Sequence, residues 1–534
     1  MTRFASKAAP SADKLRGGYY TPDPIARYLA SWVAKAGTAL LEPSCGDGAV
    51  LRRLAETAGG TEALGIELVA DEAAAAEAAS GTQVQHADFF AWFTADQQGR
   101  WDGVAGNPPY IRFGNWPEVA RTSAFALMED AGLKPSRLTN AWVPFVVGSV
   151  LALRSGGRVG LVLPAELLQV GYASQLREFL AEHLDEIRLV SFKRLVFEGI
   201  LQEVVLLLGV RGAGPASIKT IEVESAEDLE AVRWSTTSTA ITLHDHEKWT
   251  KYFLTSSQVD ALRAVQRQSG LRRLEELCSV DVGVVTGRNS FFTMTPTEAE
   301  ERGVARWCVP LVARSGQLTG ITYAQGDLAK QDADDLRTRL LVVPPDVDPS
   351  DELTEYLESG EAEGVPSGYK CSIRKSWWTV PSVWTPEAFM LRQLHTHPRL
   401  VANLTGATST DTVHRVRLAA GVDARLLATA SVNSVTFALA EVLGRSYGGG
   451  ILELEPREAE QLLVPDPSLV PDGLAERVDE LLRSGHLVEA TDLVDELVLV
   501  GQLGIDQALL DEVRGSWQRL RDRRGNRGRA KRSR

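Results

Sequence analysis

The chain has 534 residues, of which 44% are hydrophobic, so it is long enough for two domains with separate cores. Its net charge of -13 excludes a uniformly basic nucleic-acid binder, although a local positive surface is compatible with that total. No apolar run reaches the length of a membrane span, and Met1–Pro10 lacks the apolar core of a secretion signal. Four scattered cysteines and eight histidines form neither a CxxC nor an HExxH pattern, which predicts a cytoplasmic protein without a metal site or a disulfide framework.

The first informative segment is Gly18–Pro22, which precedes an apolar stripe of helical spacing in Ile25–Val33. Thr21 suits a helix N-cap and Pro22 the first helical position, so the segment also reads as a plain helix start. Ala39–Leu41 then predicts a short buried strand.

This strand runs directly into the turn Glu42–Gly48, after which the apolar pattern predicts a helix. Gly46 and Gly48 let the backbone approach a ligand, and amide groups at the helix end would face its carboxylate. The turn matches neither the dinucleotide glycine pattern nor the phosphate loop, so a pyrophosphate ligand is not favoured.

Ala63–Leu68 and Val84–Ala87 predict two further strands, and an acidic residue stands at the end of each. Glu67 at a strand's carboxyl end can accept both hydroxyls of a ribose, although a solvated surface Glu is the plainer interpretation. Asp88 can accept a hydrogen bond from an adenine amine, and Phe89 can cover the face of the ring.

The fourth predicted strand, Trp101–Gly106, ends in Asn107-Pro108-Pro109-Tyr110. The two prolines make the loop rigid and hold Asn107 extended. An exocyclic amine on a base is a poor nucleophile, but the Asn107 side-chain oxygen and the Pro108 carbonyl can accept its two N–H groups and expose its lone pair. Tyr110 can stack on the base. A proline turn that only closes a strand is the alternative.

Further elements follow this loop. The pattern predicts helices over Asn140–Leu153 and Tyr172–Leu184, and strands over Gly157–Leu163, Ile187–Phe192 and Glu203–Val210. Only about ten residues separate the last two strands, too few for a helical crossover, so the seventh strand should be antiparallel. The fold class is therefore α/β, with a Rossmann-like seven-stranded sheet whose seventh strand is antiparallel.

In this order the motifs resemble the S-adenosylmethionine-dependent DNA adenine-N6 methyltransferases of the Eco57I-type, or gamma, class of restriction-modification enzymes. The likeness is close over about the first 210 residues and looser beyond them. It implies a site-specific DNA-methyltransferase (adenine-specific) that uses S-adenosyl-L-methionine and extrudes its target from double-stranded DNA. Within the class, Asn at the first position of the loop is associated with adenine and Ser with cytosine.

The resemblance also assigns the site residues. Those of the cofactor are Tyr20, Thr21, Glu42, Ser44, Gly46, Asp47, Glu67, Asp88 and Phe89. Those of the target amine are Asn107, Pro108, Pro109 and Tyr110. Phe197 is the candidate for the second face of the target base, and the alternative for this aromatic is packing on the core.

The remaining chain predicts a mixed α+β DNA target-recognition domain over 241–470, behind a catalytic domain over 1–240. Its short strands are expected at Val280–Thr286, Trp307–Val312 and Leu340–Val343. Ser367–Trp384 holds both candidate phosphate contacts and tryptophans that could stack on bases or wedge between them, and core packing is the alternative for the tryptophans. These candidates are Lys370, Arg374 and Lys375.

The C-terminus predicts a helical segment over 471–518 and a basic, disordered tail over 519–534, with nine Lys or Arg and one Asp. Arg523 and Arg524 of this tail are candidate DNA contacts, while a solubilising tail is the alternative.

Three functions stay open at this stage. The favoured one is the modification component of a restriction-modification or related defence system, with a cognate restriction endonuclease encoded separately. The second is methylation of another amino or amide nitrogen, in protein glutamine or an RNA base. The third is a non-catalytic DNA-binding subunit, against which intact Glu67, Asp88 and Asn107 argue.

Overall fold

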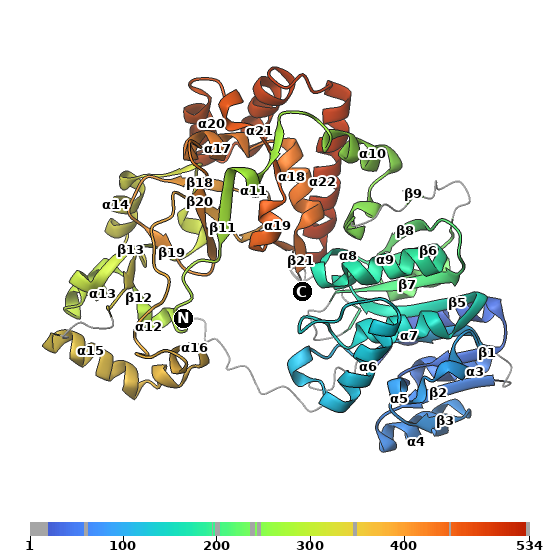
Figure 1. The fold of residues 1–534 in the computed structure, drawn as a ribbon. Helices are drawn as coiled ribbons and strands as arrows, with labels where there is room; N and C mark the ends of the chain where they lie inside the picture. Colours follow the sequence, from blue (N-terminus) through green and yellow to red (C-terminus); the bar gives the residue numbers. More distant parts are fainter. Residues whose placement is uncertain are drawn as a thin grey trace. The chain divides into compact units, whose positions relative to one another are not determined.

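The computed structural model describes residues 20–57, 62–194, 196–197, 203–234, 241–242, 247–344, 350–447 and 450–529. The chain divides into two compact units (Figure 1). The N-terminal unit holds Met1–Ser256 with Tyr447–Gly449 and Asn526–Arg534, and the C-terminal unit holds Ser257–Ser446 and Gly450–Gly525. The units meet along the chain near Ser256, whereas the sequence suggested a boundary after residue 240.

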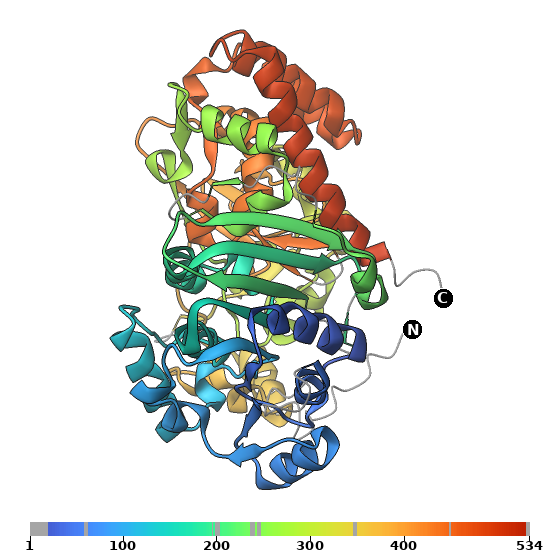
Figure 2. The same ribbon diagram turned by 90° about the vertical axis from the view of Figure 1, so that its right-hand side faces the viewer.

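The N-terminal unit is built on one large twisted sheet with helices on both of its faces (Figure 1, Figure 2). The strands are β1 (Ala39–Glu42), β2 (Glu62–Glu67), β3 (Val84–His86), β4 (Trp101–Gly106), β5 (Leu153–Pro164), β6 (Leu184–Phe192), β7 (Val204–Arg211), β8 (Ser217–Val223) and β9 (Ile241–Thr242). The helices are α2 (Asp23–Val33), α3 (Ala49–Thr57), α4 (Ala70–Ser80), α5 (Phe89–Trp92), α6 (Glu118–Asp130), α7 (Trp142–Ala152), α8 (Glu166–Gln169) and α9 (Ser174–His183).

The strand order is β3-β2-β1-β4-β5-β7-β6-β8-β9. Strands β1 to β5 are parallel, and β7 lies antiparallel between β5 and β6, as the short connection predicted. The expected total of seven strands is wrong, because the described residues form nine. β8 adds a parallel strand beside β6, and β9 pairs antiparallel with β8.

The central strands are apolar and buried on both sides, as expected for a sheet covered by helices. One large core cluster lies where the apolar stripe of α2 packs with α3 and the sheet. Helix α2 begins one residue later than expected, with Pro22 rather than Thr21 at its N-cap. Because the first four strands are parallel, their carboxyl ends and the loops that follow meet along one edge of the sheet.

The C-terminal unit is a mixed α+β body. Its helices are α10 (Ser256–Val265), α11 (Leu274–Leu277), α12 (Asn289–Phe292), α13 (Pro296–Glu301), α14 (Gln325–Ala333), α15 (Asp351–Ala362), α16 (Tyr369–Ser372), α17 (Ala424–Ala430), α18 (Ser434–Leu443), α19 (Pro456–Glu460), α20 (Leu474–Arg483), α21 (Leu487–Val494) and α22 (Gln507–Arg529). Its strands are β10 (Leu271–Arg273), β11 (Cys278–Asp281), β12 (Thr293–Met294), β13 (Cys308–Val312), β14 (Thr322–Tyr323), β15 (Arg339–Leu341), β16 (Ala388–Leu391), β17 (Gln393–Leu394), β18 (Leu400–Asn403), β19 (Thr408–Ser409), β20 (Val413–Leu418), β21 (Arg445–Tyr447), β22 (Ile451–Glu453) and β23 (Leu463–Pro465).

Two sheets organise this unit among the residues that the structure describes. The larger has the order β11-β20-β16-β18-β14, and the other has the order β12-β15-β13-β19. The strands expected near 280, 307 and 340 correspond to β11, β13 and β15. Between 20 and 529, outside the gaps given above, no single helix is long and apolar enough to cross a membrane; α17 and α18 reach that length only together and meet at 79°.

The basic C-terminal segment differs from its prediction. Helix α22 continues through Arg529, so the residues from 519 to 529 are helical rather than disordered. The part of the predicted tail that follows Arg529 lies outside the residues that the structure describes.

Candidate functional site

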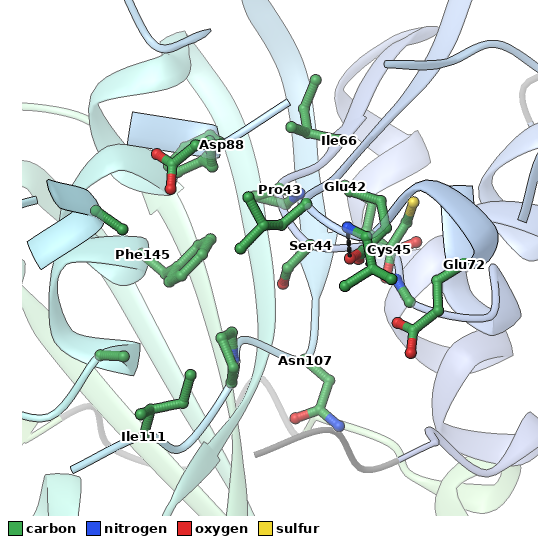
Figure 3. Close-up of a pocket in the computed structure, with 18 of the residues that line it drawn as sticks. Glu42, Pro43, Ser44, Cys45, Ile66, Glu72, Asp88, Asn107, Ile111 and Phe145 are labelled. Atoms are coloured by element: carbon green, nitrogen blue, oxygen red, sulfur yellow. Dashed lines mark hydrogen bonds between the residues drawn. The ribbon is translucent and has the colours of Figure 1, made fainter. Parts of the chain in front are cut away.

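A cavity of about 310 Å³ lies at the carboxyl ends of β1, β2 and β4 in the N-terminal unit (Figure 3). Figure 3 shows Asp88 and Phe145 on one side, Glu42, Cys45 and Glu72 on the other, and Ser44 between them. All nine residues assigned to the cofactor from sequence line this cavity: Tyr20, Thr21, Glu42, Ser44, Gly46, Asp47, Glu67, Asp88 and Phe89. Asn107 and Pro109 line it as well.

The glycine turn brings backbone close to the cavity because two of its residues adopt left-handed conformations. Gly46 has φ of +50° and Gly48 has φ of +80°. A Cβ on Gly48 would lie 2.9 Å from the Cα of Ala76, so a side chain there would also collide with α4. Amide groups of Cys45 and Gly48 bond to the carbonyls of Ile66 and Cys45, at 3.0 and 2.8 Å, which fixes the turn against β2.

Glu67 holds the same turn from the end of β2. Its Oε2 accepts from the Gly46 amide and its Oε1 from the Val69 amide, both at 2.9 Å. The side chain is buried, so these charge-assisted bonds order the cavity wall without a ligand. A lone solvated Glu, the plain sequence interpretation, is therefore wrong for this residue.

Two buried polar atoms of the wall lack a partner among the described residues: Oε2 of Glu42 and Oγ of Ser44. Burial, followed by the charge of nearby Asp47, raises the pKa of Glu42 well above its ordinary value. A buried acceptor without a donor costs free energy. A ligand with a positively charged donor group would remove that cost by bonding to both atoms.

Asp88 and Phe89 form the opposite wall. Asp88 is the N-cap of α5, where its Oδ1 accepts from the amides of Phe90 at 2.9 Å and Ala91 at 3.1 Å. Both amides bind one oxygen, which leaves Oδ2 for a ligand. The ring of Phe89 stacks on Phe145 of α7, with centroids 5.3 Å apart and planes 17° from parallel.

The Asn107–Tyr110 loop follows β4 at the cavity edge. The Tyr110 hydroxyl lies 3.0 Å from Oδ1 of Asn107 and 3.1 Å from the Val162 carbonyl, either of which it can donate to. Asn107 is half-buried, and Pro108 and Tyr110 are not among the residues that line the cavity. Tyr110 instead packs against the core cluster.

Phe197 is also part of that core cluster, where it is 6% exposed. It does not line the cavity. The structure thus agrees with the alternative stated for Phe197, which is packing on the core. Its role against the target base stays a prediction.

The candidate DNA contacts of the C-terminal unit separate into two kinds. Lys370 in α16 and Lys375 after it are exposed. Arg374 instead donates to the carbonyls of Val285 and Thr286, both at 2.9 Å, and so anchors the segment. Trp377 and Trp378 of the same segment pack on the core of this unit, which is the core alternative stated above.

The assignment of Arg524 to a DNA-tracking tail is wrong. Arg524 is 3% exposed and pairs with Glu441 of α18, with Nη2–Oε1 and Nε–Oε2 distances of 2.5 and 3.0 Å. It also donates to the carbonyls of His395 and Gly450. Its neighbour Arg523 is half-buried. The prediction failed because a local run of basic residues does not reveal that one of them pairs with Glu441, 83 positions earlier in the chain.

Sequence reasoning missed part of the lining. The additional residues include Ile66, Leu68, Val69, Glu72, Ile111, Asn115, Trp116, Pro117, Ala120, Ala141 and Phe145. Phe145 lies in a helix that is apolar all round, so no periodic signal marks it as a lining residue. Glu72 was within reach of prediction, because it follows β2 closely and stands in the first turn of α4.

The electrostatic character of the cavity is acidic. Five carboxylates line it: Glu42, Asp47, Glu67, Glu72 and Asp88. Among the described residues that line it there is no Lys, Arg or His. The cavity therefore suits a ligand with a net positive charge and an aromatic ring.

Comparison with known proteins gives two family matches on separate parts of the chain. Residues 61–197 match the model of the Eco57I restriction-modification methylase. Residues 246–499 match the model of the C-terminal domain of the Type II methyltransferase M.Eco57I.

Similar proteins extend over most of the chain. It is 20% identical to the Type II methyltransferase M.AccI of Acinetobacter calcoaceticus, over 87% of the chain and 88% of that protein. It is 24% identical to M.XamI of Xanthomonas campestris pv. amaranthicola, over 84% and 85%. Among solved structures, the DrdV–DNA complex is similar in fold, with a TM-score of 0.50 and 10% identity over 88% of this chain and 57% of DrdV.

Proposed function

Because the chain belongs to the Eco57I family of restriction-modification methylases, we propose that it is a site-specific adenine methyltransferase acting on double-stranded DNA. The methyl donor is S-adenosyl-L-methionine, and the acceptor is the exocyclic amine of adenine. One observation carries the proposal: residues from four separate loops, each assigned from sequence, surround a single cavity that Asn107 borders.

The cavity residues fit this donor. Glu42 Oε2 and Ser44 Oγ, which have no partner among the described residues, suit the ammonium of its methionine part. Asp88 Oδ2 suits the adenine amine, and the ring of Phe89 can cover the base. Glu67 lines the expected ribose end and holds the glycine turn in place. The donor supplies a methyl group on a sulfonium, whose departure leaves a neutral thioether.

The acceptor side rests on the Asn107–Tyr110 loop. Asn107 Oδ1 and the Pro108 carbonyl each accept one hydrogen bond from the target amine, which favours tetrahedral nitrogen and an available lone pair. An amide oxygen has two lone pairs, so Asn107 can keep its bond from the Tyr110 hydroxyl while it accepts a second. The ring of Tyr110 supports the extruded base, with Phe197 as the candidate for the other face.

The C-terminal unit would read the DNA sequence. The relatives M.AccI and M.XamI are named Type II methyltransferases, and DrdV was solved bound to DNA. The exposed lysines Lys370 and Lys375 are candidate phosphate contacts, held by the anchored Arg374 between them. The protein would act as the modification component beside a separately encoded endonuclease.

Adenine is favoured over cytosine by Asn at the first position of the loop. Protein glutamine and RNA bases are the alternative substrates with a similar amine or amide. Their experimental signature differs, because neither leaves modified bases in chromosomal DNA.

The test is expression in a bacterial host without DNA methylation, followed by single-molecule sequencing of the host DNA. Methyladenine in one short sequence motif, absent with Asn107→Ala, is the expected result. Methylcytosine would overturn the assignment to adenine, and an unmodified genome with folded protein that binds the methyl donor would move the reaction to another substrate.

A further inference from the structure

The segment between the Asn107–Tyr110 loop and α7 has no role in the function proposed so far. Both ends of this segment lie at the cavity. Ile111 and Ala141 each line it, and the Ala141 amide donates to the Ile111 carbonyl over 2.9 Å. Within it, Asn115 and Pro117 line the cavity and are also exposed. The segment is therefore one of the walls at which the cavity reaches the protein surface, as are the exposed lining residues Tyr20 and Leu68.

Four cations stand on this segment. Arg121 of α6 is half-buried and lies over the ring of Phe113, with 4.2 Å from its Cζ to the ring centroid. The other three, Arg112, Lys134 and Arg137, are exposed, and none of them forms an ion pair with a residue that the structure describes. The acidic residues of the segment, Glu118, Glu129 and Asp130, all lie on α6, whereas the three exposed cations lie in the loops before and after that helix. In a chain of net charge -13, uncompensated cations beside the cavity are a local exception.

The loop that carries Lys134 and Arg137 has a defined conformation. The Lys134 amide donates to Oε1 of Gln175 on α9 over 2.7 Å. The Ser136 amide donates to the Thr139 hydroxyl over 2.9 Å, and Thr139 itself is buried. Because these bonds already hold the backbone, a ligand that binds Lys134 and Arg137 does not incur the entropic cost of ordering the loop.

Two large apolar side chains accompany the cations and face solvent. Val119 at the start of α6 is 83% exposed, and Leu138 beside Arg137 is 73% exposed. A combination of apolar side chains and cations is complementary to the backbone of DNA, in which charged phosphates alternate with less polar deoxyriboses.

We infer that this segment is a DNA-contacting surface of the N-terminal unit, where Arg112, Lys134 and Arg137 bind backbone phosphates of the duplex that flanks the extruded base. Val119 and Leu138 lie against the sugars. The inference rests on the proposed function, because the polyanion is identified by the base that the neighbouring cavity would receive. Since phosphates carry no sequence information, this surface adds affinity and orientation for every sequence equally.

The test measures the salt dependence of duplex binding. A fluorescent DNA duplex of about 30 base pairs is titrated with the full-length protein at several salt concentrations, and the slope of log K against log salt is compared between variants. The variant Lys134→Ala/Arg137→Ala should bind about tenfold more weakly at low salt, with a slope shallower by about two; Arg112→Ala should lower the slope by about one.

A matched control removes the same charge elsewhere. Lys35→Ala/Arg100→Ala replaces two exposed cations of the same unit that stand before β1 and β4, at the sheet edge opposite the cavity, and should leave the slope unchanged. Calorimetric affinity for the methyl donor and thermal unfolding should be the same in all variants, since the replaced side chains are exposed and outside the cavity lining.

The outcomes separate the two proposals. If wild-type protein methylates host DNA but Lys134→Ala/Arg137→Ala keeps the wild-type slope, the surface is wrong and the function stands. If wild-type protein binds duplex RNA in preference to DNA, or binds no duplex, both proposals fall.

Discussion

The Tyr110 hydroxyl lies 3.0 Å from Oδ1 of Asn107, the atom proposed to accept a hydrogen bond from the target amine. The bond orients the Asn107 amide, because a hydroxyl near Oδ1 favours the rotamer with oxygen, rather than nitrogen, on that side. Tyr110 thus has two separable parts: a hydroxyl within hydrogen-bond distance of Asn107, and a ring that is proposed to support the base.

We expect Tyr110→Phe to keep methylation within about tenfold of wild type and Tyr110→Ala to lose about 10- to 100-fold, since base stacking is worth about 1–3 kcal/mol. Asn107→Ala should lose about 100-fold or more. Single-turnover rates on a duplex that contains the recognised site give all three values. Equal losses for Phe and Ala at position 110 would show that the hydroxyl, and not the ring, carries the role.

Replacement of Glu42 separates stability from binding. Its raised pKa means that the folded protein holds the carboxyl proton more tightly than the unfolded chain does. The contribution of Glu42 to stability is therefore greatest below its ordinary pKa and is lost as pH rises through the raised pKa. Glu42→Gln stays neutral, so the empty variant should be more stable than wild type at pH 8, with the difference shrinking toward pH 4.5.

The same variant should bind the methyl donor more weakly, by about 1–3 kcal/mol, because a charged hydrogen bond to the ammonium is lost. Denaturant unfolding at both pH values and calorimetric titration measure the two effects. A variant less stable than wild type at pH 8 would contradict the buried, partner-free state of Oε2.

Gly148 controls the position of Phe89. A Cβ at Gly148 of α7 would lie 2.7 Å from Cε1 of Phe89 and 3.3 Å from Cδ2 of Leu127. Gly148→Ala should therefore displace Phe89 from Phe145, reduce affinity for the methyl donor and destabilise the protein by about 1–3 kcal/mol.

Gly171→Ala is the control, because nothing lies within 4 Å of a Cβ there. Its unfolding and its donor affinity should match wild type. Equal donor affinity in the two variants would remove Phe89 from the cofactor site.

Arg524 should act on folding and not on DNA. Arg524→Ala leaves the carboxylate of Glu441 buried without its partner, which should cost about 3–5 kcal/mol. Arg524→Met with Glu441→Leu removes both charges and should restore most of the loss. Thermal unfolding measures stability, and the salt slope of duplex binding should stay at the wild-type value in the double variant. A reduced slope there would return Arg524 to the DNA contacts.

The cavity was largely predictable because its parts are local strand–turn–helix units. Trp101–Gly106 is the fourth strand as expected, and the ends of β1 and β2 deliver Glu42 and Glu67 as their positions suggested. Parallel strands bring such ends together without any knowledge of side-chain packing.

The remainder depends on contacts that no local pattern encodes. The strand β8 has the mixed sequence Ser217–Val223 after a glycine-rich stretch, so its pairing with β6 becomes visible only in the sheet. Phe145 is one apolar residue of a wholly buried helix. Arg524 lies in a basic run, and its partner Glu441 belongs to another helix.

The acidic lining of the cavity also bears on which cellular adenosine compounds can occupy it. ATP and dinucleotides share adenine and ribose with the methyl donor but carry phosphates. The carboxylates of Asp47, Glu67, Glu72 and Asp88 would repel these groups, with no cationic side chain among the described lining residues to offset the repulsion. S-adenosylmethionine carries a net positive charge and meets no such barrier. The lining thus gives the protein a means of avoiding competition from abundant nucleotides, independent of how well the adenosine moiety itself fits.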